Sequence, residues 1–181
     1  MNPFDQAESR RIKSETWRRA LRGEDLDLLA PLLLHSGQRQ VNDDIESRKA
    51  SREVLEIARK WGKTWFCVFR SVLTCLRKPK SRVVYGAPTH KHLLEFVLPV
   101  LSEFFEDCPT PPRYKETTGH LEFPNGSWVH FFGADDKPSA DRGRGPKAEL
   151  AVFDEAGFCP VLQYVLKSVF RPSLLLSGGP T

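Results

Sequence analysis

Three consecutive residues, Gly62, Lys63 and Thr64, have the chemistry needed to hold a phosphate group. Glycine lets the backbone approach a phosphate, lysine supplies positive charge to the β- and γ-phosphates, and a threonine hydroxyl can ligate Mg²⁺. An apolar pattern at helical spacing follows directly, so the N–H groups of a helix N-terminus are expected to face the anion. The usual phosphate-loop pattern opens with another glycine, where this chain has Ile57. A Gly-Lys-Thr run also occurs in ordinary loops, but the flanking strand and helix patterns favour a phosphate site.

A second candidate site is the pair of acids, Asp154 and Glu155, that ends the apolar run 150–153. In nucleotide-binding αβ folds, the carboxyl end of such a strand faces the phosphates. Asp154 is therefore expected to hold Mg²⁺, and Glu155 to orient an attacking water or accept its proton. Alone, the pair is equally compatible with ordinary loop acids. Combined with the upstream phosphate loop, it predicts hydrolysis.

Strand and helix patterns alternate around these two motifs. Expected strands cover 53–58, 82–87, 149–153 and 173–177, and expected helices cover 62–76, 89–106 and 161–170. This alternation indicates a parallel sheet whose crossover helices lie on its faces.

Two further regions depart from that alternation. The middle of the chain predicts short antiparallel strands at 113–117, 120–123 and 127–132, with a hairpin turn at Asn125-Gly126. The N-terminal region predicts helices over 5–34, interrupted at Gly23, then a turn at 35–37 and a polar helix over 38–49.

Composition narrows the class of protein. The 181 residues, 40% hydrophobic and 28% charged, are enough for one globular domain with a sizeable core. No apolar run reaches the length of a membrane helix, and the start has no apolar signal-peptide region. The cysteines lack CxxC spacing and the histidines lack zinc-ligand spacing, which favours reduced thiols and no metal cluster.

The net charge of +4 permits contact with a polyanion. Scattered surface charge is a sufficient explanation for that total. Basic residues nevertheless gather in short runs, which are candidate phosphate contacts. These runs are 10–13, 18–19, 77–82 and 142–144.

Several segments together resemble the motor domain of viral terminase large subunits. ARKWGKT at 58–64 is similar to that family's variant Walker A motif, which lacks the leading glycine. APTHKH at 87–92, FPNGSWVHFFGADD at 123–136, DRGRGPKAELAVFDEA at 141–156 and SGGPT at 177–181 match later family segments in the same order. The resemblance covers about residues 36–181.

The resemblance implies a fold and a domain division. The fold would be a P-loop NTPase three-layer αβα sandwich, with a mainly parallel central sheet and an inserted β-hairpin. Residues 1–35 would form an N-terminal helical extension, and residues 36–181 the ATPase core. The sequence reaches only the coupling motif SGGPT, so the core is expected to be incomplete at its C-terminal end. The nuclease domain is expected to be absent, and this chain is not expected to cut DNA.

The same resemblance implies residue roles for ATP and Mg²⁺. Phosphate-loop contacts would come from Arg59, Lys60, Trp61, Gly62, Lys63 and Thr64. Thr64 and Asp154 would hold the metal, and Glu155 would be the catalytic base. Gln38, or alternatively Gln40, would read the adenine edge. Arg144, then Arg142, is the candidate finger that reaches a neighbouring subunit's ATP.

By the same resemblance, the function would be ATP hydrolysis that moves double-stranded DNA into a viral capsid. The partners would be DNA, the portal protein, the terminase small subunit and further copies in a ring. The location would be the host cytoplasm, at the capsid portal during packaging, with no membrane contact. Two alternatives remain: a helicase-type or translocase-type P-loop ATPase, and a nucleotide-binding or DNA-binding module without turnover.

Overall fold

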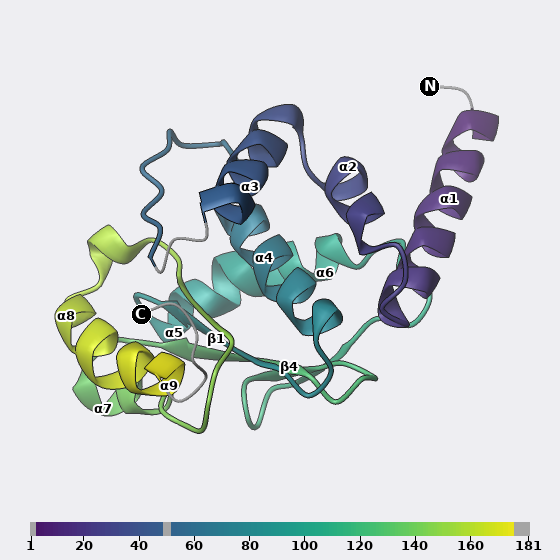
Figure 1. Ribbon diagram of the computed structural model, residues 1–181. Helices are drawn as coiled ribbons and strands as arrows, with labels where there is room; N and C mark the ends of the chain where they lie inside the picture. Colours follow the sequence, from purple (N-terminus) through teal and green to yellow (C-terminus); the bar gives the residue numbers. More distant parts are fainter. Residues whose placement is uncertain (1–2, 49–51, 176–181) are drawn as a thin grey trace.

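The computed structural model describes residues 3–48 and 52–175 (Figure 1). At its centre lies a five-stranded sheet with the order β2-β3-β4-β1-β5. β1 pairs in parallel with both β4 and β5, whereas the β2–β3 and β3–β4 pairs are antiparallel. The strands are β1 (Arg82–Ala87), β2 (Arg113–Lys115), β3 (His120–Glu122), β4 (Trp128–Gly133) and β5 (Leu150–Phe153).

One face of the sheet is covered by α4 (Lys63–Arg77), whose apolar side packs on β1 and β4 (Figure 1). α4 is in turn flanked by the helices that precede it and by the long segment that follows β1. The preceding elements are α1 (Pro3–Leu21), η1 (Leu26–Leu28), α2 (Leu29–Leu33) and α3 (Ser36–Arg48). The following segment is α5 (His90–His92), the π-helical η2 (Leu93–Val97) and α6 (Leu98–Phe104).

Helical segments of the described chain cover the opposite face around β1, β5 and the neighbouring half of β4. There Val84 and Phe132 pack against Ala140 and Val169 from two helical segments. Those segments are α7 (Lys137–Asp141) and a C-terminal run of helix. That run comprises α8 (Leu162–Tyr164), the π-helical η4 (Val165–Phe170) and α9 (Arg171–Leu175), preceded by the short η3 (Ala156–Phe158). The arrangement is compatible with an αβα sandwich.

The hairpin region belongs to the main sheet. The predicted Asn125-Gly126 turn is present, with Gly126 at φ 81°, and Ser127 N–H donates to the Asn125 side chain at 3.0 Å. Beyond the turn, β4 runs parallel to β1, in register from Arg82↔Trp128 to Ala87↔Gly133. The strand thus joins the antiparallel outer strands to the parallel core.

The predicted strand at 53–58 is wrong. These residues are extended without joining the sheet, and Val54 is 77% exposed. Only part of the segment packs on the core, through the partly buried Leu55. With acids at two of its positions, the segment has too few apolar side chains for a strand buried on both faces.

The strand predicted at 173–177 is also wrong over its described part, because α9 extends through Leu175. A short leucine-rich run suits a helix as well as a strand, and here it continues the preceding helical turns. Residues 176 and 177 lie outside the described residues. The turn expected at 35–37 is likewise shorter, since α3 already begins at Ser36.

Candidate functional site

Asp154 lies directly after β5 and is 3% exposed. Its Oδ2 accepts hydrogen bonds from the Thr64 hydroxyl at 2.7 Å and the Tyr85 hydroxyl at 3.2 Å. Its Oδ1 accepts the Glu155 backbone N–H at 3.0 Å. The structure thus brings together the Gly-Lys-Thr segment at the start of α4 and the acidic pair after β5.

The Cys67 thiol on α4 lies near the charges of Asp154, Glu155 and Lys63. Burial raises the pKa of this thiol, the negative charges of Asp154 and Glu155 raise it further, and the Lys63 ammonium opposes them. One partly buried thiol on α4 therefore lies within electrostatic reach of all three groups. The lysine and both carboxylates surround the same region at the edge of the parallel sheet.

Tyr85 is a member of this cluster that the sequence did not indicate. Its side chain is fully buried in β1, and burial together with the nearby negative charge raises the pKa of its hydroxyl. The hydroxyl therefore stays protonated and donates to Asp154. One signal for it was present: a tyrosine inside an apolar strand usually needs a polar partner for its hydroxyl.

The loop before α4 has a strained shape. Lys60 and Gly62 adopt positive φ values of 65° and 85°. A side chain at Gly62 would place its Cβ 2.7 Å from the Gln38 amide nitrogen, so the position requires glycine on both counts. At the end of the loop, Lys63 Nζ donates to the Ile57 carbonyl at 3.0 Å.

Gln38 clamps this loop from α3. It is 3% exposed, and its Nε2 donates to the carbonyl oxygens of Trp61 at 3.2 Å and Gly62 at 3.1 Å. Its Oε1 accepts the His35 backbone N–H at 3.3 Å. Gln40, the alternative reader of adenine, is exposed on the same helix.

His35 is a second contact that the sequence did not indicate. Its Nδ1 accepts the Gln38 N–H at 3.3 Å, so Nε2 carries the ring hydrogen, 3.1 Å from the Trp61 carbonyl oxygen. The rings of His35 and Trp61 meet edge to face, with centroids 5.3 Å apart. The remaining loop residues, Arg59 and Lys60, are exposed.

Glu155 also has a strained backbone, with φ 50° in the left-handed region. That conformation is uncommon outside glycine and concentrates at functional sites. The Glu155 backbone N–H donates to the buried carboxylate of Asp154, and the residue itself is partly exposed.

The two candidate finger arginines lie elsewhere. Arg144 donates to the Tyr164 hydroxyl at 2.7 Å and pairs with Asp141 at 2.7 Å, and Arg142 is exposed at the end of α7. Over the described ranges 3–48 and 52–175, neither arginine contacts Thr64 or Asp154.

The Thr64 and Asp154 oxygens fit Mg²⁺. Both are hard donors, already 2.7 Å apart at a helix N-terminus, and Mg²⁺ commonly takes one or two protein oxygens and leaves its other positions to water and phosphate. Within the described residues there is no cluster of three or more His, Cys, Asp or Glu side chains that could form a closed metal site.

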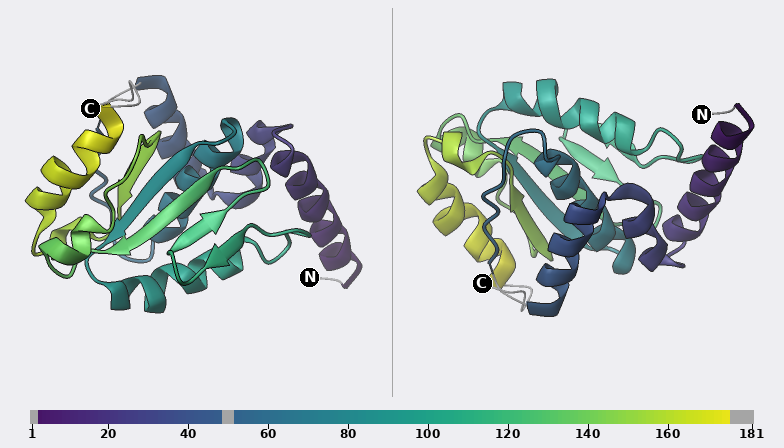
Figure 2. Two further views of the ribbon diagram at one scale, coloured as in Figure 1. Left: turned by 90° about the horizontal axis from the view of Figure 1, so that it is seen from below. Right: turned by 90° about the horizontal axis from the view of Figure 1, so that it is seen from above.

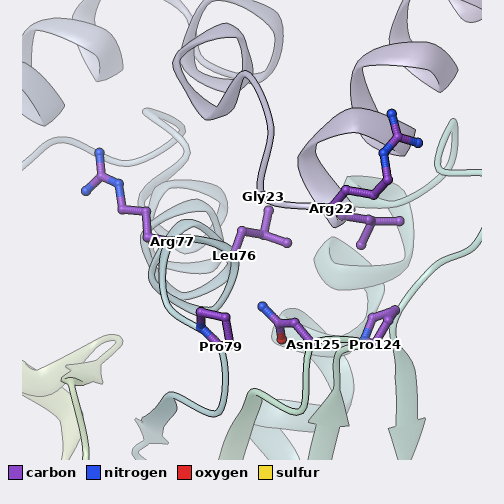
Figure 3. Close-up of a pocket in the computed structure, with 8 residues that line it drawn as sticks. Arg22, Gly23, Leu76, Arg77, Pro79, Pro124 and Asn125 are labelled. Carbon is purple, nitrogen blue, oxygen red and sulfur yellow. The ribbon is translucent and has the colours of Figure 1, made fainter.

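A hollow of about 570 Å³ lies at the other end of α4 (Figure 3). Leu76 and Pro79 line it, and the guanidinium groups of Arg22 and Arg77 point away from its centre. Those arginines pair with Glu24 and Glu46. The hollow therefore offers no cation to a phosphate and is separate from the Thr64–Asp154 cluster.

The comparisons with known proteins give one match. Residues 54–169 match the family model described as terminase large subunit, T4likevirus-type, N-terminal. No curated protein and no solved structure matches the chain. None of the helices described over 3–48 and 52–175 combines the length and apolar character needed to cross a bilayer.

Proposed function

The chain belongs to the T4-like terminase large-subunit family, whose role is in phage DNA packaging, and we propose that it is a P-loop ATPase that drives double-stranded DNA into a viral capsid. The observation that supports this most directly is the 2.7 Å hydrogen bond between Thr64 and Asp154. It joins a phosphate-loop residue to a buried carboxylate at the carboxyl end of a parallel strand, where nucleotide phosphates bind in such folds.

In the proposed mechanism, ATP phosphates lie against the turn from Gly62 into α4. The Lys63 ammonium exchanges the Ile57 carbonyl for the phosphates, and the N–H groups of the α4 N-terminus add to the positive field. Thr64 and Asp154 would hold Mg²⁺, which neutralises charge that develops on the phosphates. Glu155 orients the attacking water and accepts its proton.

Adenine recognition is proposed for Gln38, with Gln40 as the alternative. Both donor hydrogens of the Gln38 amide are directed at loop carbonyls in this structure. Reading the adenine edge therefore requires Gln38 to release Trp61 or Gly62. Nucleotide binding and loop position would then be coupled through one side chain.

The finger is proposed to act between subunits. Arg144 is exposed, and its guanidinium is held by Asp141 and Tyr164 and not by its own Thr64–Asp154 cluster. In a ring of identical copies it would contact the ATP of a neighbour, and Arg142 is the second choice. A positive charge supplied in this way can accelerate phosphoryl transfer about 10³-fold or more.

We further propose the partners that this role requires: double-stranded DNA, the portal protein and the small subunit, at the capsid portal in the host cytoplasm. Residues 1–35 would be a helical extension of the ATPase core, which begins at about residue 36.

The test uses Glu155→Gln, an isosteric change that removes the proposed base. ATP binding should remain within about threefold of the unchanged protein, while phosphate release with DNA and partner proteins present should fall about 100-fold or more. Glu95→Gln, an exposed change of the same kind on η2, is the control and should leave turnover unchanged. Normal turnover in Glu155→Gln would remove this assignment. ATP binding without turnover in the unchanged protein would instead support a module that binds but does not hydrolyse.

A further inference from the structure

Half of one sheet face carries charged and aromatic side chains. Cross-strand register places these residues on the same side: Arg113 pairs with Glu122 and Glu122 with Trp128, while Lys115 pairs with His120 and His120 with His130. Figure 2, left, looks directly onto these strands, and no helix lies in front of them. We call this surface the outer face. It consists of Arg113, Lys115, His120, Glu122, Trp128 and His130.

A buried arginine borders the outer face without a carboxylate partner. Arg82, which pairs with Trp128 across β1 and β4, is 4% exposed. Among residues 3–48 and 52–175, its guanidinium contacts the carbonyl oxygens of Pro146 and Gly143 (3.4 Å) and the Trp128 ring at 4.8 Å, and its Nε finds no hydrogen-bond partner there. A buried guanidinium normally has a carboxylate or other anion beside it, so this charge is left without compensation by the described residues.

Burial is the main cause that lowers the pKa of both histidines of the outer face, and nearby positive charge adds to it. Burial, together with smaller contributions from His120 and Arg82, lowers the pKa of His130 to about 4. Burial also lowers the pKa of His120. Arg82 and Lys115 add to that decrease, and Glu122 opposes it. Glu122 is the single acid of the outer face, and Lys115 already pairs with it at 2.8 Å. Arg113, Lys115 and the bordering Arg82 outnumber this one carboxylate, which favours an anion on the surface.

Two basic runs noted in the sequence meet at the border of the outer face. Arg82 connects the 77–82 run to the 142–147 loop through the carbonyls of Gly143 and Pro146. Beside this connection, Lys78 and Lys147 lie 2.8 and 3.8 Å from the same carboxylate, that of Glu149. Segments distant in sequence thus place two lysines beside one carboxylate.

We propose that the outer face binds the phosphate backbone of double-stranded DNA. The choice of DNA rests on the proposed packaging function, and the choice of surface rests on the charge distribution above. A duplex fits better than a single strand, because the Trp128 ring already contacts His120 (centroids 4.2 Å apart) and Arg82. Single-strand binding usually needs free aromatic rings on which bases stack.

The first test measures binding of a fluorescein-labelled blunt duplex by anisotropy over a salt series. Arg113→Ala combined with Lys115→Ala should weaken binding about tenfold and lower the slope of log K against log salt by about 2. The matched control is Arg48→Ala combined with Lys91→Ala, two exposed residues outside the basic runs, each paired with an acid four residues away in sequence. The control should stay within about twofold of the unchanged protein.

The second test predicts a gain, which misfolding cannot produce. Glu122→Gln removes the one carboxylate of the outer face and should tighten duplex binding about threefold at low salt. The gain should disappear at high salt, because screening removes it.

The outcomes separate this inference from the proposed ATPase function. Equal losses in the outer-face double variant and in the Arg48→Ala, Lys91→Ala control, or unchanged binding in Glu122→Gln, would overturn the outer face as the DNA site. Tighter binding of a single strand of the same length would overturn the choice of duplex. If the protein binds the duplex as expected but never binds ATP, the ATPase proposal fails and the outer face stands. If it hydrolyses ATP but does not bind the duplex, the reverse holds.

Discussion

The cluster around Asp154 and the outer face differ in how far the protein compensates a buried charged side chain. Asp154 is almost completely buried and accepts three hydrogen bonds from protein donors. Arg82 is equally buried, yet it has only carbonyl oxygens and an aromatic ring as partners. The first cluster is saturated by the protein itself, whereas the second carries positive charge that the described residues do not neutralise.

This difference indicates how a ligand would act at each place. At the Asp154 cluster, a ligand must replace contacts that already exist, such as the one between Lys63 and Ile57. Binding there should change the loop. At the outer face, a ligand supplies missing negative charge and needs to displace little. Binding there should depend mainly on salt.

The largest effect is expected for Lys63→Ala. Removing the ammonium takes away the main positive charge next to the phosphates, so ATP turnover should fall about 1,000-fold, while duplex binding at the outer face stays unchanged. Phosphate release and duplex anisotropy on the same sample measure both. Lys91→Ala, an exposed change on α5, is the control. A parallel loss of duplex binding would show that the two regions are not independent.

A second effect concerns stability and pH at the outer face. The pKa of His130 falls from 6.5 to about 4 on folding, so the unfolded chain binds a proton more readily. Its contribution to stability is therefore present above about pH 6.5 and is lost as pH falls toward 4, with an upper limit of about 3 kcal/mol. Urea unfolding at several pH values measures it.

His130→Phe keeps a ring at this position but cannot titrate. This variant should lose less stability than the unchanged protein between pH 6.5 and pH 4. Bound duplex should also reduce that loss in the unchanged protein, because its phosphates are anions beside the histidine. Identical pH profiles with and without His130 would contradict the lowered pKa of His130.

The sequence predicted residues of the Asp154 cluster but did not predict the outer face. It identified Lys63, Thr64 and Asp154 because phosphate chemistry needs those residue types at fixed positions beside a strand and a helix. It identified the basic runs but not the outer face, because strand register alone decides that Arg113, Trp128 and Arg82 share a side.

The limits of prediction were similar for the fold. The parallel pairing of β1 with β5 and the crossover helices followed from the alternating pattern and were confirmed. The parallel pairing of β4 with β1 was not predicted, because the sequence placed 127–132 among the antiparallel strands. The strands predicted at 53–58 and 173–177 were not confirmed over their described parts. Strand pairing depends on the edge of a neighbouring strand, which local sequence does not specify. Tyr85 and His35 were missed for the same reason, since their partners lie far away in the sequence.

The smallest effect is expected for Gln38→Ala, which removes the clamp on the phosphate loop. The KM for ATP should rise about fivefold while kcat changes less than twofold, because the loop is positioned less well but the reacting groups remain. Gln40→Ala separates the two candidates for adenine recognition. If Gln38 reads adenine, its variant should also lose the preference for ATP over GTP, and Gln40→Ala should keep it.

The central claim is that Thr64 and Asp154 together hold the metal that accompanies ATP. Calorimetric titration of ATP with and without Mg²⁺ tests it most directly, on the unchanged protein and on Thr64→Val. Valine has nearly the same shape but removes the hydroxyl that contacts Asp154. We predict that Mg²⁺ tightens ATP binding about tenfold or more in the unchanged protein and has little effect in Thr64→Val. An equal response to Mg²⁺ in both proteins would contradict the claim.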